Sequence, residues 1–202
     1  MKLKNPPAAR GRPRAFDPDA ALQQALELFW RQGYEGTSLS DLTAAMGINR
    51  PSLYAAFGNK EQLFRKALDR YLSGPAACFD EALRQPTARA VAQRLLQGVV
   101  CQLGDPQNPG GCLVVQAALS SGAEADPIRQ VLAAHRNDAR HALRRRFQRA
   151  VAAGDLPAGT KAADLAAYLM AVVHGLAVQA AGGLSRKELQ AVADLALRTW
   201  PA

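Results

Sequence analysis

The chain has 202 residues, with 25 Lys and Arg against 17 Asp and Glu, and a formal net charge of +8. Apolar residues make up 49% of it, which excludes wholesale disorder, and the length is ample for one extended domain or for a small head joined to a larger body. Three cysteines, Cys78, Cys101 and Cys112, are an odd number that argues against a disulfide scaffold and favours a reducing compartment such as the cytoplasm.

The first 14 residues are basic and irregular. They hold Lys2, Lys4, Arg10, Arg12 and Arg14 without an acidic residue, and three prolines and a glycine prevent a regular helix. This pattern predicts a flexible basic arm over residues 1–14. Such an arm can neutralise phosphates or enter a minor groove of DNA, although a solvated tail without a partner has the same composition.

Residues 17–72 read as a series of short capped helices. Asp17-Pro18 predicts the start of a first helix that ends at Gly33, and Ser38 and Asp41 have capping-box spacing before a short helix to Ala45. Gly47 is a candidate C-cap, Asn49 or Ser52 can begin the next short helix, and Asn59 with Gln62 begins a longer one to about Leu72.

Two of these short helices, joined by Met46-Gly47-Ile48-Asn49, have the pattern of a helix-turn-helix. Gly47 allows the sharp turn, Ile48 is expected to fill the angle between the helices, and Leu42 and Leu53 are expected to face the core. The second helix would then present polar side chains that can bond phosphates or base edges.

Beyond Pro75 the pattern is one of longer helices, so the fold class expected is all-α. Helices are predicted over residues 87–103, 112–120, 126–153, 160–181 and 185–199. Residues 162–184 are apolar enough that a membrane-spanning helix has to be considered. Asp164, His174, Gln179 and the many Ala and Gly residues favour a buried helix instead. The arginines of residues 136–149 favour a solvated helix face or a set of ion pairs over a binding patch.

The head of the chain resembles the TetR family of transcriptional repressors over about residues 10–72. The resemblance rests on Gly11-Arg12-Pro13-Arg14, Phe16-Asp17, residues 25–29, residues 33–38, Gly47-Ile48, residues 52–57 and residues 60–64. It implies a basic arm (1–14), a helix-turn-helix DNA-binding domain (15–60) and a helical ligand-binding and dimerisation domain (61–202). It also implies a dimer that binds a palindromic operator.

Carried over by position, the resemblance implies a set of DNA contacts. Thr37 and Tyr54 are expected to contact phosphates, Lys60 adds charge at a helix N-terminus, and Arg12 and Arg14 belong to the arm. Asn49, Arg50, Pro51 and Ser52 are expected to read bases or adjacent backbone, with Arg50 suited to guanine because its guanidinium can bond O6 and N7 together.

Polar or thiol groups on the apolar helices of the body are the candidate ligand-binding residues, because a small-molecule site needs a few polar groups in an apolar cavity. They are Cys101, Cys112, Gln116, Tyr168 and His174. Cys112 follows Gly110-Gly111 near a predicted helix N-terminus, which favours a thiolate. Some relatives with a similar Gly-Cys-Leu-Val-Val segment sense electrophiles through cysteine, so electrophile or oxidant sensing is one hypothesis and plain packing is the other.

The sequence favours a regulator over an enzyme. It has no phosphate-cradling glycine loop, no nucleophile elbow and no paired-carboxylate arrangement, and its Cys and His residues lack metal-ligand spacing, so we expect no cofactor or metal. The function predicted is a ligand-responsive repressor that binds operator DNA as a homodimer through its last two helices and is released by a small-molecule effector. A DNA-binding activator or architectural protein without a ligand would have the same head and is the alternative.

Overall fold

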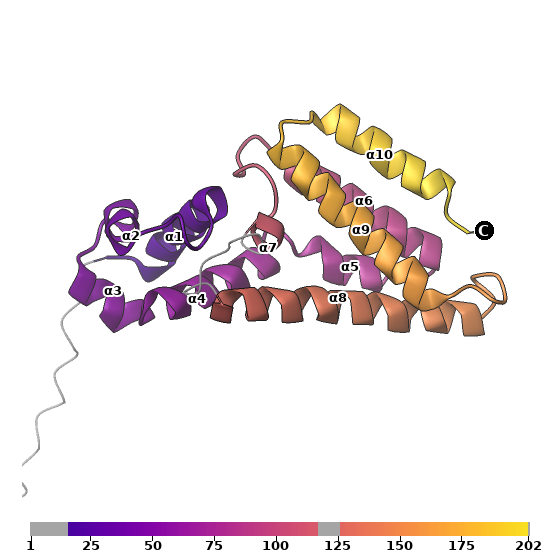
Figure 1. Ribbon diagram of the computed structural model, residues 1–202, viewed down its shortest axis with the longest axis horizontal. Coiled ribbons are helices and arrows are strands. Elements are labelled where there is room, and N and C mark those ends of the chain that lie inside the picture. Colours follow the sequence, from indigo (N-terminus) through magenta and orange to yellow (C-terminus); the bar gives the residue numbers. More distant parts are fainter. Residues whose placement is uncertain (1–15, 117–125, 202) are drawn as a thin grey trace, which may run out of the picture.

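The computed structural model describes residues 16–116 and 126–201, which form ten α-helices (Figure 1). This confirms the all-α class. The predicted arm, including Arg12 and Arg14, lies outside the described residues. The helices are α1 (Pro18–Gln32), α2 (Leu39–Met46), α3 (Arg50–Phe57), α4 (Lys60–Ser73), α5 (Cys78–Leu83), α6 (Ala88–Leu103), α7 (Leu113–Gln116), α8 (Asp126–Ala152), α9 (Ala162–Ala181) and α10 (Arg186–Arg198).

The helix ends lie where the capping residues predict them. The Asp17 side chain accepts a hydrogen bond from the Asp19 amide before α1, and complete capping boxes precede α2, α4 and α10. Gly47 follows α2 in the left-handed conformation, with φ of 65°, which a residue with a side chain rarely adopts. Local hydrogen bonds therefore account for most of the boundaries.

A first hydrophobic cluster holds the head together. Most of its large buried side chains come from α1 to α4, among them Phe29, Trp30, Leu42, Leu53 and Phe64. Phe29 and Phe64 meet edge to face, with ring centroids 5.1 Å apart. The boundary predicted between residues 60 and 61 falls at the start of α4, yet the buried face of α4 belongs to this cluster.

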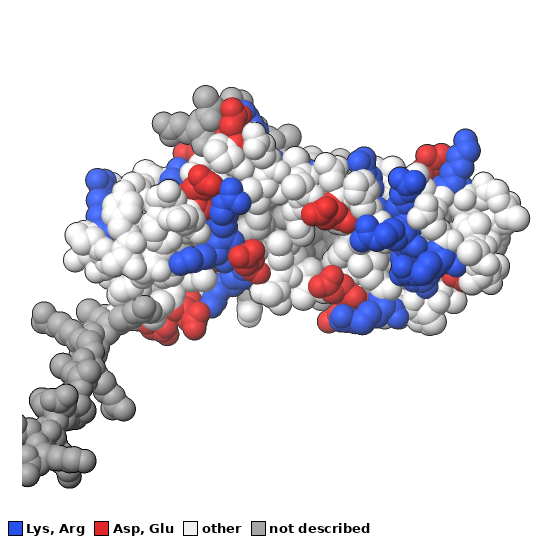
Figure 2. All heavy atoms as spheres, turned by 90° about the horizontal axis from the view of Figure 1, so that it is seen from below, with Lys and Arg blue, Asp and Glu red and all other residues white. Residues whose placement is uncertain are grey.

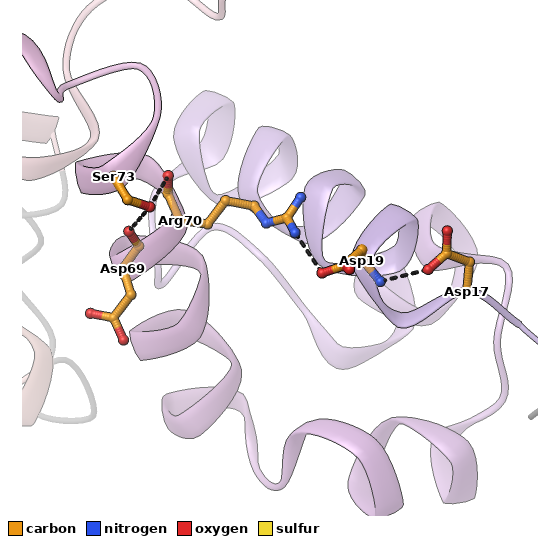
Figure 3. Close-up of polar contacts among 5 residues, drawn as sticks. All are labelled: Asp17, Asp19, Asp69, Arg70 and Ser73. Atoms are coloured by element: carbon orange, nitrogen blue, oxygen red, sulfur yellow. Dashed lines mark hydrogen bonds and ion pairs between the residues drawn. The ribbon is translucent and has the colours of Figure 1, made fainter.

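An ion pair fastens α4 to the start of α1. Arg70 Nη2 lies 2.7 Å from Asp19 Oδ1, and Figure 3 shows this contact between the two helices. In the same figure the hydroxyl of Ser73 donates to the carbonyl oxygens of Asp69 and Arg70 in the last turn of α4. These contacts are largely exposed, so packing of the apolar faces supplies most of the attachment.

A second hydrophobic cluster forms the body from α5, α6, α8, α9 and α10. The long helix α8 connects the two clusters, because Ile128 and Leu132 pack in the head cluster whereas Leu143 and Phe147 pack in the body cluster. Figure 1 shows α8 running along the lower side of the body, from below α7 to the end far from the head. A displacement at one end of α8 can therefore reach the other core.

The short helix α5 was absent from the sequence predictions. Its N-cap, Ala77, makes no side-chain capping bond, so the sequence carries no start signal there. The helix forms because its apolar face packs on α6, where Ala82 is fully buried. The predicted helix over residues 112–120 is described only as far as Gln116, where α7 ends.

Helix α9 is the one helix among the described residues that is long and apolar enough to cross a membrane, and one third of its most apolar stretch is buried. In the fold it packs against α6, α8 and α10. The helix is therefore only partly buried in the described structure, whereas its polar and small residues predict a buried helix.

The arginine run of α8 is divided between packing and solvent. Arg146 is buried and donates to the carbonyl oxygens of Gln85 and Pro86, at 2.9 and 2.8 Å, which ties α8 to the turn before α6. Arg144, Arg145 and Arg149 are exposed. Figure 2 shows basic side chains gathered over the body end of the face that it presents.

Candidate nucleic-acid interface and ligand cavity

Helices α2 and α3 form the predicted helix-turn-helix. Leu42 and Leu53 are fully buried in the head cluster, and half-buried Ile48 packs against it between the two helices. The outer side of α3 carries Arg50, Pro51 and Tyr54, all exposed, while Ser52 is half-buried. An exposed helix with a guanidinium, a hydroxyl and a phenol is a surface that can bond phosphates and base edges.

The polar residues of this surface are held in defined positions. Arg50 Nη2 donates to the hydroxyl of Ser40 on α2, at 3.0 Å. Asn49 Oδ1 accepts from the Ser52 amide at 2.9 Å, so Asn49 is the N-cap of α3 as well as a surface residue. Ser40, which the sequence analysis missed, is exposed beside Arg50, and only the packing of α2 on α3 reveals it.

Tyr54 and Lys60 lie at the surface and Thr37 does not. The Tyr54 side chain is 49% exposed. Half-buried Lys60 is the first residue of α4, with its Nζ 4.4 Å from the ring centroid of Tyr34. Thr37 is fully buried and its hydroxyl donates to the Gly33 carbonyl at 2.7 Å, so its side chain is used to close the turn after α1. The structure therefore does not bring the Thr37 side chain to the predicted phosphate-binding surface.

A cavity of about 150 Å³ lies where the head meets the body. Its walls come from α4, α5, α6, α7, α8 and α9 and are mostly apolar, with Phe79, Leu95, Val99, Met170 and Val173 among them. Such a volume and lining suit a small apolar molecule held by a few polar groups.

Two of the five predicted ligand-binding residues, Cys112 and His174, line this cavity. The other three lie elsewhere: Cys101 is exposed on α6, and Tyr168 is exposed on α9 with its hydroxyl 3.3 Å from that of Thr199. Gln116 donates to the Gly110 carbonyl at 2.9 Å and holds the loop before α7. Helix periodicity alone did not distinguish the side of each helix that faces the cavity.

The cavity wall also holds five polar residues that the sequence did not indicate as ligand-binding: Tyr71, Asp80, Gln102, His135 and Arg136. Tyr71 was predicted only to lie within the helix that runs to about Leu72, and Arg136 was one member of an arginine run. Burial lowers the pKa of His135 and His174 from the ordinary 6.5, so both imidazoles are neutral at pH 7.

Cys112 belongs to a short hydrogen-bonded chain at the edge of the cavity. The Tyr71 hydroxyl donates to Cys112 Sγ at 3.2 Å, and Gln102 Nε2 donates to the Tyr71 hydroxyl at 2.7 Å. Because Gln102 occupies an acceptor site of the phenol oxygen, the phenol proton is directed to sulfur. Burial and the neighbouring thiol raise the pKa of Tyr71 well above 10, so the phenol keeps the proton that it donates.

Trp30 connects this chain to the first helix of the head. Its indole Nε1 donates to the Gly111 carbonyl at 3.1 Å, one residue before Cys112. Its ring also meets that of Tyr71 edge to face, with centroids 4.8 Å apart. A change in the position of Cys112 or Tyr71 therefore acts directly on α1 and α4.

Metal binding finds no support in the parts of the chain that the structure describes, where no group of three or more His, Cys, Asp or Glu side chains could hold an ion.

Comparisons with known proteins agree with this geometry. Residues 21–67 match the bacterial regulatory proteins of the tetR family, and residues 86–194 match the tetracyclin repressor-like C-terminal domain. The HTH-type transcriptional repressor ComR of Escherichia coli K12 is 33% identical over 195 residues, which cover 96% of this chain and 93% of ComR. BdcR, a repressor of the same strain, is 30% identical and covers 97% of this chain and 95% of its own length.

The fold of this chain is also similar to that of a solved structure. A cysteine mutant of the TetR family transcriptional regulator CifR, in complex with 26-bp double-strand operator DNA, is 46% identical with a TM-score of 0.89, and the match covers 95% of this chain and 100% of that one. Both the head and the body of this chain are thus similar to the corresponding parts of TetR family regulators. The chain belongs to the TetR family of transcriptional regulators, which are not enzymes.

Proposed function

We propose that this protein is a cytoplasmic, ligand-responsive transcriptional repressor that binds a palindromic operator as a homodimer and leaves it when a small molecule enters the cavity. The observation that carries the proposal is the position of the cavity, which shares Tyr71 with the hydrophobic core of the DNA-binding head. ComR and BdcR are repressors and CifR was crystallised with operator DNA, which supports the same activity here.

In this proposal the exposed side of α3 enters the major groove. Arg50 pairs with a guanine, while Asn49, Pro51 and Ser52 contact neighbouring bases or backbone. Tyr54 and Lys60 contact phosphates, Lys60 with the help of the N-terminus of α4, and Arg12 and Arg14 of the arm add further backbone or minor-groove contacts.

The homodimer forms through α9 and α10. These two helices expose apolar side chains that a monomer leaves in water: Tyr168, Val178, Val192 and Leu195. Two-fold symmetry of the dimer requires two matching half-sites in the operator.

The effector acts at the edge of the cavity where Cys112 lies. An electrophile or oxidant that modifies Cys112 Sγ removes the hydrogen bond from Tyr71 and adds bulk beside Gly111. Trp30 then transmits the displacement to the head. The alternative, an activator or architectural protein without a ligand, leaves this cavity without a role.

Operator selection from random duplex DNA tests the proposal, with and without a mild thiol oxidant. We expect enrichment of a palindrome, loss of binding in oxidant, and retained binding in Cys112→Ser. Cys101→Ser is the matched control, because Cys101 is exposed and lies outside the cavity. Absence of any enriched sequence contradicts DNA reading, whereas an enriched palindrome indifferent to oxidant contradicts only the role of Cys112.

A further inference from the structure

The guanidinium of Arg136 lines the cavity, and no carboxylate among the described residues forms an ion pair with it. We propose that this cavity has a second, non-covalent effector besides the agent that modifies Cys112: a small organic carboxylate whose apolar part fills the cavity and whose carboxylate pairs with Arg136. This inference rests on the proposed function, in which the same cavity holds the effector.

Arg136 reaches the cavity from α8, and its Nη1 donates to the Val114 carbonyl at 3.1 Å. Its guanidinium also interacts electrostatically with Cys112, but within the described residues it makes no further hydrogen bond and no ion pair. Within the same described part of the chain, no carboxylate lies within ion-pair distance of Arg136. A half-buried guanidinium stays charged, so an unpaired one in an apolar wall has a desolvation cost that an anionic ligand removes.

The other charged and titratable groups of the cavity wall are less suited than Arg136 to pair with a carboxylate ligand. His135 and His174 are neutral imidazoles that can each donate one hydrogen bond to a ligand oxygen. Asp80 also lines the cavity, but it is exposed and its charge acts on His135. Arg136 is thus the one permanent cation in the cavity wall as described, and its planar guanidinium matches a carboxylate.

The remaining wall determines the size and character of the ligand. The cavity of about 150 Å³ has a volume that accommodates a benzene-sized group in other proteins. Its apolar side chains include Phe79 of α5, Val99 of α6 and Met170 of α9. The ligand class is therefore a carboxylate with one ring or a short alkyl chain.

A purely structural role for Arg136 is distinguishable from this one. If Arg136 serves only to donate to the carbonyl of Val114 in α7, a neutral donor of similar reach replaces it. Arg136→Gln keeps a donor and removes the charge, whereas Arg136→Lys keeps the charge. Arg140→Gln is the matched control, because Arg140 lies about one turn further along α8, bonds Asn137 and is absent from this cavity wall.

The experiment is calorimetric titration of the full chain with benzoate, phenylacetate and hexanoate, each compared with its amide of nearly equal size. We expect the wild type and Arg140→Gln to bind at least one carboxylate about tenfold more tightly than its amide, because a charged hydrogen bond is stronger than a neutral one. In Arg136→Gln the ratio should fall to within about twofold, and in Arg136→Lys most of it should remain.

The inference is overturned if the wild type binds amides as tightly as carboxylates, if none of the three carboxylates binds, or if Arg136→Gln keeps the preference. Should Arg136→Gln fail to fold, the wild-type ratio and Arg136→Lys decide the question. Operator binding is measured on the same samples without ligand. Its absence contradicts the proposed function and leaves the ratio of carboxylate to amide affinity unaffected, so the two failures are distinguishable.

Discussion

Trp30 shows how one side chain joins the head to the cavity. Its N–H is buried and bonded to the Gly111 carbonyl, and its ring packs against Tyr71. A buried carbonyl that loses its donor costs about 1–3 kcal/mol. The hydrogen bond from Trp30 to the Gly111 carbonyl therefore stabilises the fold, and it also couples the position of Cys112 to that of α1.

Replacement of Trp30 by Phe keeps an aromatic ring and removes this N–H. We expect the free energy of unfolding to fall by about 1–3 kcal/mol more than for Trp200→Phe, since the buried Trp200 Nε1 has no hydrogen-bond partner among the described residues. Urea denaturation of both variants measures the difference. Equal losses would mean that the Gly111 bond contributes nothing beyond ring packing.

Arg50 and Lys60 are predicted to act differently on DNA. Arg50→Ala should relax base preference at one operator position and weaken specific binding by about 1–3 kcal/mol, because a bidentate contact to guanine is lost. Lys60→Ala should weaken binding to all sequences about equally and reduce the slope of affinity against salt by about one unit. Titrations of operator and scrambled duplexes at several salt concentrations separate the two outcomes, and an unchanged base preference in Arg50→Ala removes its assignment.

At the scale of the element, the recognition helix α3 depends on its first cap. Asn49 Oδ1 accepts from the Ser52 amide, and loss of such a cap costs about 1 kcal/mol. Asn49→Ala should therefore lower both thermal stability and operator affinity, whereas Asn49→Ser, which restores a cap, should recover stability. If operator affinity stays low in a stable Asn49→Ser, the amide of Asn49 reads DNA directly. Full recovery of affinity would limit Asn49 to capping.

The capping box of α2 makes the stability of the fold depend on pH in the acid range. Hydrogen bonds from Ser38 lower the pKa of Asp41 below its ordinary 3.8, although the carboxylate is exposed. A group with a lowered folded-state pKa stabilises the fold above its unfolded pKa, and that stabilisation is lost as the pH falls through the folded value. The urea midpoint of the wild type should thus drop more between pH 7 and pH 3 than that of Asp41→Asn. Asp69→Asn, on a carboxylate that caps no helix, should behave as the wild type does, and a drop in Asp41→Asn equal to that of the wild type would contradict the assignment.

At the scale of the whole molecule, the exposed apolar side chains of α9 and α10 favour a dimer. Leu195 is 53% exposed, and Val178 and Val192 are similarly exposed. Leu195→Glu should therefore shift the protein towards monomer in light scattering and weaken operator binding, since a single head contacts only one half-site. Lys187→Glu, which puts the same carboxylate at an exposed polar position of α10, should remain dimeric. A dimeric Leu195→Glu would place the interface elsewhere.

The sequence by itself determined the features that depend on neighbours along the chain. The capping boxes at Ser38 and Asn59, the turn at Gly47 and the inward faces of Leu42 and Leu53 are local hydrogen bonds or helical periodicities, and the structure has them as predicted. The head pattern was also sufficient to indicate the family.

Only the tertiary structure decided which side chains meet in space. In the structure Thr37 is buried, and Cys101, Gln116 and Tyr168 lie outside the cavity wall. Residues that are distant in the sequence meet in that wall: Tyr71, Gln102, Cys112, Arg136 and His174. Periodicity shows which side of a helix is apolar, but it does not show which neighbouring helices enclose that side. The cavity depends on the packing of six helices, and packing is a property of contacts between distant segments.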